Sequence, residues 1–164
     1  DYFDDKIDRH ISMFRALNYP DQVVAPLPGQ LRAGEHSDYG SLTLLRQEDR
    51  PGGLQVMTKS GDWFDVPVVE GALVVNIGDL MAEWTNDRWV STLHRVVNPP
   101  ADAANDSRRI SLVFFHQPNY DAMIRCLPTC LAPGEEPNHA AISSGEHLFS
   151  KFVKQATFGA GLET

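Results

Sequence analysis

The sequence is poor in cysteine, in positive charge and in long apolar runs, and each shortage excludes a class of protein. Two cysteines in 164 residues are too few for a disulfide framework. No stretch approaches the ~20 consecutive apolar residues that a membrane helix needs. Fourteen Lys and Arg against 22 Asp and Glu give a net charge of −8, which disfavours nucleic acid and anionic membrane surfaces as partners. We therefore expect a cytoplasmic globular protein that binds neither nucleic acid nor membranes.

The two cysteines, Cys126 and Cys130, would need two further ligands to form a zinc site. His139 and His147 are the nearest candidates, and their spacing does not match a zinc motif. We expect two reduced thiols instead.

The chain also lacks an initiating methionine and begins Asp1-Tyr2-Phe3, without the basic and apolar segments of a signal peptide. Its length suits one domain, at ~150 residues per domain. A composition of 42% hydrophobic and 22% charged residues is ordinary for a globular protein. We expect residues 1–164 to form a single domain that belongs to a longer protein.

Short apolar runs are separated by glycine, proline and polar turns, a pattern typical of an all-β fold. Strands are predicted at residues 13–19, on either side of 38–40, in a hairpin at 54–57 and 63–66, and at 72–77, 93–97 and 110–116. Helical patterns are confined to residues 1–10, one turn at 79–84, and a terminal helix that begins at the Ser-x-x-Glu signature of residues 143–146. The sequence therefore predicts a β-sandwich or barrel with a short N-terminal helix and a C-terminal helix.

His36-Ser37-Asp38 is the first candidate for chemistry. On a strand, residues i and i+2 point to the same face, so this imidazole and this carboxylate would converge. His94 lies on a later predicted strand and can complete the set. Two histidines and one carboxylate leave one side of a metal open, which suits a non-haem Fe(II) oxygenase or a catalytic zinc site. Taken singly, each histidine can equally be a hydrogen-bonded core residue.

Arg109-Ile110-Ser111 is the second candidate, because the same alternation places a guanidinium beside a hydroxyl. This pair suits one carboxylate. The face continues with the apolar residues Val113 and Phe115, and an arginine there needs an anionic partner. That partner is either a protein carboxylate or a small dicarboxylic ligand. His116 alternates to the other face and is not expected to be a ligand.

Together these motifs resemble the Fe(II)- and 2-oxoglutarate-dependent oxygenases of the isopenicillin N synthase-like superfamily. The matching segments, in the order of the family, are residues 14–20, 35–45, 53–56, 76–79, 84–86, 91–96 and 109–111. The resemblance implies a double-stranded β-helix, or jelly roll, that forms the C-terminal catalytic half of a longer protein. It also implies that His36, Asp38 and His94 hold Fe(II).

The resemblance further implies a site for 2-oxoglutarate. Arg109 and Ser111 would bind its distal carboxylate, and Tyr19 matches the family tyrosine that helps to bind it. Leu17 stands where plant-type members often carry asparagine. The interval from His94 to Arg109 is longer than usual, which predicts a longer turn outside the site.

The implied activity uses O2 and couples the decarboxylation of 2-oxoglutarate, to succinate and CO2, to hydroxylation, desaturation or cyclisation of a small organic substrate. Val113 and Phe115 are expected as apolar walls of the site. Leu42 and Leu44 are also expected to line the site if Gly40 does not interrupt the alternation of side chains that follows Asp38.

Three alternatives stay open. The first is an oxidase of the isopenicillin N synthase type, which takes all electrons from its substrate and does not use 2-oxoglutarate. The second is a metal-binding jelly roll without turnover. The third is a zinc hydrolase, which lacks a clear general base here, because Glu35 should point to the face opposite His36.

Overall fold

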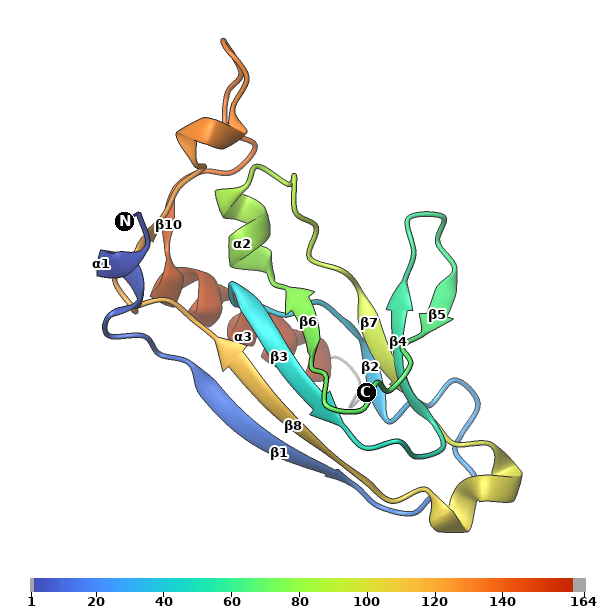
Figure 1. Cartoon of the computed structure of the whole chain (residues 1–164). Coiled ribbons are helices and arrows are strands. Elements are labelled where there is room, and N and C mark those ends of the chain that lie inside the picture. The colour runs from blue at the N-terminus through green and yellow to red at the C-terminus, as the bar shows by residue number, and fades with distance from the viewer. Residues whose placement is uncertain (1, 161–164) are drawn as a thin grey trace.

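Two four-stranded antiparallel sheets face each other in a jelly roll (Figure 1). This computed structural model describes residues 2–160, and the side chains up to residue 155. The first sheet has the order β1-β8-β3-β6. Its strands are β1 (Met13–Tyr19), β8 (Arg109–His116), β3 (Leu42–Gln47) and β6 (Val74–Ile77). The second sheet has the order β2-β7-β4-β5. Its strands are β2 (Ala33–His36), β7 (His94–Val97), β4 (Gly53–Met57) and β5 (Trp63–Asp65).

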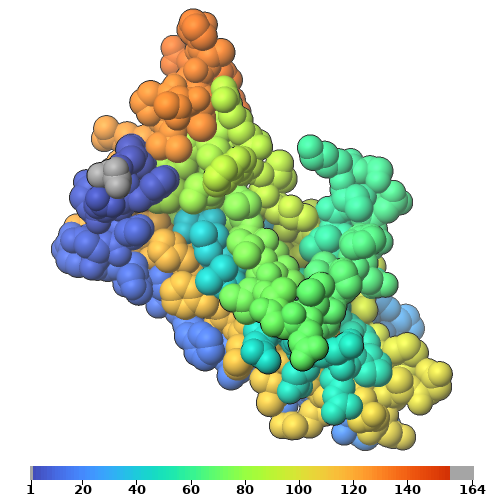
Figure 2. Space-filling model, in the orientation of Figure 1, coloured from blue at the N-terminus to red at the C-terminus, as the bar shows by residue number. Residues whose placement is uncertain are grey.

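A small third sheet and a few helices close one end of the molecule. The remaining elements are β9 (Met123–Ile124), β10 (Ile142–Ser143), α1 (Asp4–Ile7), α2 (Asp79–Trp84), α3 (Ser144–Ala160) and the 3-10 turns Ala101–Asp106 and Pro128–Cys130. Figure 2 shows the segment that leads to β10, in orange, projecting from this end. In the part of the chain described, no helix has the length and apolar character needed to cross a membrane.

The predicted strands and the terminal helix are confirmed. Apart from the hairpin of β4 and β5, strand neighbours in both sheets are not consecutive in the chain, as in a jelly roll. The capping box also forms, because Ser143 Oγ accepts the Glu146 N–H at 3.2 Å and the Glu146 carboxylate accepts the Ser143 N–H at 3.3 Å. The long interval before β8 is taken up by the 3-10 turn Ala101–Asp106, which lines neither of the two cavities bounded by His36 and Asp38.

A cluster of buried apolar side chains joins α2 to β9. Leu80 is 0% exposed, and Trp84 and Ile124 are each 1% exposed. Phe3 packs edge-to-face on Trp84, with ring centres 5.2 Å apart. This cluster holds the N-terminal segment and α2 against the end of the sheets.

Leu80→Ala is expected to lower the free energy of unfolding by about 2–5 kcal/mol, because it leaves a cavity in a fully buried position. Leu73→Ala is the matched control, since Leu73 is 52% exposed and surface substitutions usually change stability by about 0.5 kcal/mol or less. Urea denaturation of both variants measures the difference. Equal losses would contradict this account of the core.

Candidate active site

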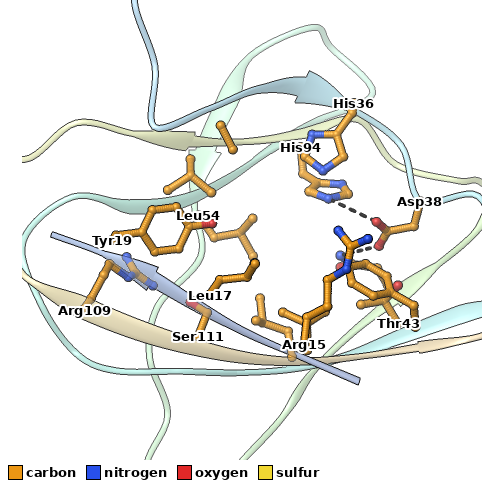
Figure 3. A pocket seen from close by; sticks show the side chains of 16 residues that line it. Arg15, Leu17, Tyr19, His36, Asp38, Thr43, Leu54, His94, Arg109 and Ser111 are labelled. Atoms are coloured by element: carbon orange, nitrogen blue, oxygen red, sulfur yellow. Dashed lines mark hydrogen bonds and ion pairs between the residues drawn. The ribbon is translucent and has the colours of Figure 1, made fainter. Parts of the chain in front are cut away.

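Two histidines and one aspartate converge between the sheets (Figure 3). His36 ends β2 and His94 begins β7, and the two are register partners across these antiparallel strands. Their ring centres lie 4.3 Å apart. Asp38 Oδ1 lies 3.7 Å from His94 Nε2. One ligand atom of each residue lies within 4.8 Å of the other two, so the group could hold a metal ion.

This convergence was predicted from the alternation of side chains along one strand, and that explanation is wrong. β2 ends at His36, so Asp38 lies in the following loop and does not share a strand face with His36. The loop is instead held by α2, whose Asp79 N–H donates to the Asp38 carbonyl at 2.8 Å. Gly40 and Gly78 allow the approach, because a Cβ on Gly78 would collide with the Gly40 carbonyl. Cross-strand pairing and this loop, not alternation, bring the three side chains together.

Backbone carbonyls orient both imidazoles. His36 Nδ1 lies 2.7 Å from the Gly34 carbonyl, and His94 Nδ1 lies 3.1 Å from the Thr92 carbonyl. These contacts leave the Nε2 atom of each ring for a metal, which is the usual arrangement of histidine ligands. Asp38 and His94 are buried, whereas His36 is exposed. The group is therefore open on one side, as an Fe(II) oxygenase site requires.

Asn76 is a member of the site that the sequence argument did not identify. Its side-chain amide on β6 donates to Asp38 Oδ2 at 3.5 Å. Asn76 belongs to a segment that resembles the family, but nothing local in the sequence shows that it reaches Asp38. It contacts the carboxylate oxygen other than the one nearest His94.

A cavity of about 180 Å³ runs from this group to Arg109, Ser111 and Tyr19. Tyr19 on β1 is the register partner of Arg109 on β8, and Leu17 is the partner of Ser111. Pairing of these two strands thus gathers the four residues at one end of the cavity. Leu17 contributes an apolar group where related enzymes often have an amide.

The walls of this cavity confirm part of the prediction. Val113 and Phe115 line it, as expected. Leu42 and Leu44 do not line it, because the alternation breaks after Asp38, which is the condition under which they were to be excluded. Their neighbours Thr43 and Leu45 face the cavity instead, because the chain leaves the β conformation between β2 and β3 and the alternation does not continue from Asp38.

Arg109 is a buried cation with neutral partners. It is 3% exposed, and it donates to the Gly52 carbonyl at 3.0 Å and to Gln47 Oε1 at 2.9 Å. Within the described residues its Nε has no hydrogen-bond partner and it forms no ion pair. Burial lowers the pKa of Arg109, and Tyr19 has the largest opposite effect on this pKa. A buried guanidinium without a carboxylate partner is suited to an anionic ligand.

Close packing fixes this guanidinium. A Cβ on Gly53 would lie 2.8 Å from Arg109 Nη1, so a larger residue at this position would displace the guanidinium. Gln47 is the second functional residue that sequence reasoning missed, because its contact with Arg109 depends on the register of β3 against β8.

Tyr19 can donate a hydrogen bond into the same end of the cavity. Burial raises the pKa of its phenol, against the opposite effects of Arg109 and Arg32. The hydroxyl therefore stays protonated at neutral pH. Ser111 is 4% exposed and supplies a second hydroxyl.

The residues of the alternative zinc site are engaged elsewhere. His139 Nε2 lies 2.9 Å from the Asp87 carboxylate, and His147 Nδ1 lies 3.3 Å from Glu83 Oε1. Cys126 and Cys130 are free thiols.

The sequence of this chain is similar to a family model and to known proteins. Residues 11–118 match the family model of the 2OG-Fe(II) oxygenase superfamily. The 2-oxoglutarate-Fe(II) type oxidoreductase hxnY of Emericella nidulans is 40% identical over 144 residues, which are 87% of this chain and 40% of hxnY. The validamycin A dioxygenase of Streptomyces hygroscopicus subsp. limoneus is 36% identical over 151 residues, or 90% of this chain and 40% of that enzyme. The chain thus spans about 40% of the length of these curated relatives.

Solved structures agree with the fold. A full-length Neurospora crassa protein in complex with alpha-KG superimposes with a TM-score of 0.84 at 41% identity, covering 93% of this chain and 47% of the Neurospora chain. The same protein in complex with alpha-KG and thymine gives a TM-score of 0.85 at 40% identity, covering 94% and 47%.

Proposed function

The chain belongs to the 2OG-Fe(II) oxygenase superfamily, and we propose that residues 1–164 form one catalytic domain that oxidises a small organic substrate at the expense of 2-oxoglutarate. The observation that carries this proposal is the pairing of two features in one cavity: the open group of His36, Asp38 and His94, and the buried Arg109 with neutral partners. The first suits Fe(II). The second suits a carboxylate.

In this proposal each residue has a physical role. His36 and His94 bind Fe(II) through Nε2, and Asp38 binds it through a carboxylate oxygen. Bound Fe(II) would supply the redox chemistry with O2 that couples decarboxylation of 2-oxoglutarate, to succinate and CO2, to oxidation of the substrate. The protein positions the reactants beside these three residues.

The other end of the cavity positions the co-substrate. Arg109 neutralises the distal carboxylate of 2-oxoglutarate, and Ser111 and Tyr19 donate hydrogen bonds to it. The walls between this end and the metal group are largely apolar, and Leu54 and Val96 belong to them. These apolar walls exclude water. Exclusion of water strengthens these charge interactions.

The substrate is expected to be a small molecule, and the protein to act in the cytoplasm. The similar Neurospora crassa protein was solved in complex with thymine, a small molecule, which supports the first expectation. The size of the site supports it too, because one cavity next to the metal group has a volume of about 460 Å³, within the roughly 300–1,000 Å³ of small-molecule pockets.

The test is anaerobic addition of Fe(II) and 2-oxoglutarate, followed by exposure to O2. A visible metal-to-ligand charge-transfer band and formation of succinate are the expected results. If neither is observed, the proposal is overturned in favour of an oxidase that does not use 2-oxoglutarate, or of a metal-binding domain without turnover.

Gln47→Glu is expected to raise the dissociation constant of 2-oxoglutarate about tenfold or more. The new carboxylate would form an ion pair with Arg109 and compete with the ligand, whereas the native amide only orients the guanidinium. The loss of the charge-transfer band on dilution measures this constant. Glu70→Gln, a change of one charge at an exposed residue that lines neither cavity, is the control. An unchanged constant in Gln47→Glu would contradict the role of Arg109.

A further inference from the structure

A second cavity, of about 460 Å³, adjoins the first. The two share Arg15, His36, Asp38 and Phe115, so any occupant of the second cavity lies beside the metal group. Its walls come from the inner face of β1 and β8, from the loop after β2, and from α3. The co-substrate residues Arg109, Ser111 and Tyr19 are not among them.

Arg15 is held at the boundary of the two cavities by neutral groups. Its Nε donates to Met13 Sδ at 3.0 Å, and its guanidinium carbon lies 5.9 Å from the ring centre of Phe115. Figure 3 shows the guanidinium on the side of the cavity where Asp38 lies. Within the described part of the chain no carboxylate forms an ion pair with it. The terminal nitrogens therefore remain available to a ligand.

The charges around the two cavities leave Arg15 without a counterion. Arg15, Asp38 and Arg109 are the charged side chains among the residues that line them. In the proposed function, Fe(II) and Arg109 are balanced by Asp38 and the two carboxylates of 2-oxoglutarate. The positive charge of Arg15 has no counterion in this set, and because Arg15 is exposed, water screens this charge until a ligand covers it. A substrate with a single negative charge would compensate it.

Two walls of the second cavity are suited to an apolar body, and the polar residues Ser37, Tyr39, Gln117 and Gln155 complete its lining. Ile11 and Met13 contribute one wall, and Leu148 and Phe152 of α3 contribute another. Phe152 is 45% exposed and Met13 is 40% exposed, so both side chains present apolar surface that a ligand could cover. Burial of such surface stabilises binding by about 25 cal/mol per Å².

We propose that the second cavity binds the primary substrate, and that this substrate is a small monocarboxylate with an apolar body. This inference rests on the proposed function. The planar fork of Arg15 binds the carboxylate through paired N–H donors, which match its geometry. The apolar residues hold the body between β1 and α3, and the carbon to be oxidised lies toward His36.

The test compares acids with their neutral amides. Hexanoate with hexanamide, and 3-phenylpropanoate with 3-phenylpropanamide, are titrated calorimetrically into the anaerobic protein with Fe(II) and 2-oxoglutarate. At least one acid is expected to bind about tenfold or more tightly than its amide. Arg15→Gln should weaken the acid about tenfold or more, while the affinities for the amide and for 2-oxoglutarate change less than about twofold.

Two further variants complete the design. Arg15→Lys keeps the charge and should retain part of the preference for the acid. Arg46→Gln removes an exposed arginine of β3 that lines neither cavity, and it should bind the acid as the native protein does. Circular dichroism checks that each variant is folded.

Equal binding of acids and amides overturns the inference. So does a rise in the dissociation constant of 2-oxoglutarate in Arg15→Gln, which would assign Arg15 to the co-substrate. Absence of the charge-transfer band in the native protein is a separate result that overturns the proposed function. In that case titration of the same acids and amides without 2-oxoglutarate still decides whether Arg15 binds a carboxylate.

Discussion

His36→Ala is expected to abolish iron-dependent turnover while leaving the fold intact. His36 is exposed and its ring contacts the Gly34 carbonyl, so its removal costs little stability. Loss of an outer partner of a metal ligand already weakens metal binding about 10–100-fold, and loss of a ligand itself should exceed this. Anaerobic Fe(II) titration measures the affinity, and succinate formation measures turnover.

His139→Ala is the matched control for this experiment. His139 is also partly exposed and pairs with Asp87 away from both cavities. It should bind Fe(II) with native affinity. If His36→Ala retained iron affinity and succinate formation, the metal assignment of His36, Asp38 and His94 would be wrong.

Arg109→Met is expected to raise the dissociation constant of 2-oxoglutarate about 100-fold or more. Methionine fills part of the volume but offers neither charge nor hydrogen bonds, and each hydrogen bond to a charged group contributes about 1.5–3 kcal/mol. Two such bonds to one carboxylate account for the expected factor. Iron affinity should be nearly unchanged, because Arg109 lies at the far end of the cavity from the metal group.

Arg108→Gln provides the comparison, since Arg108 precedes Arg109 but is exposed. Its affinity for 2-oxoglutarate should match that of the native protein. The charge-transfer band, titrated with 2-oxoglutarate, reports both constants. A native constant in Arg109→Met would refute the role of Arg109, and a loss of iron affinity in the same variant would indicate damage to the fold.

The two variants separate the two halves of the site. His36→Ala should lose iron and with it the charge-transfer band, whereas Arg109→Met should keep iron and show the band only at high 2-oxoglutarate. A common cause such as unfolding cannot produce both patterns. The pair of experiments therefore distinguishes a metal ligand from a residue that binds the co-substrate.

The residue types of the site could be read from the sequence because they occur in short motifs. His36-Ser37-Asp38 and Arg109-Ile110-Ser111 are local patterns, and alternation along β8 correctly placed Val113 and Phe115 on the face of Arg109. Strand positions were predictable for the same reason, since alternation and turn residues act over a few positions.

Other features depend on contacts between distant segments. Asp38 reaches the metal group from a loop held by α2, so alternation within β2 was the wrong explanation. Asn76 reaches Asp38 in this loop from β6, and Gln47 reaches Arg109 from the neighbouring strand β3. No local pattern encodes these partners, because the register of one strand against another is set by the whole sheet.

Local patterns in the chain thus predicted an all-β fold, and composition disfavoured nucleic acid, whereas the candidate metal and co-substrate residues were assigned together only through the resemblance to a known family. How those residues meet depends on the folded molecule. Pairing of β1 with β8 places Tyr19 beside Arg109, and the position of α3 across from β1 and β8 creates the second cavity with Arg15 at its edge. Cavities and unpaired buried charges arise from the packing of separate elements, so they become visible only when the chain is folded.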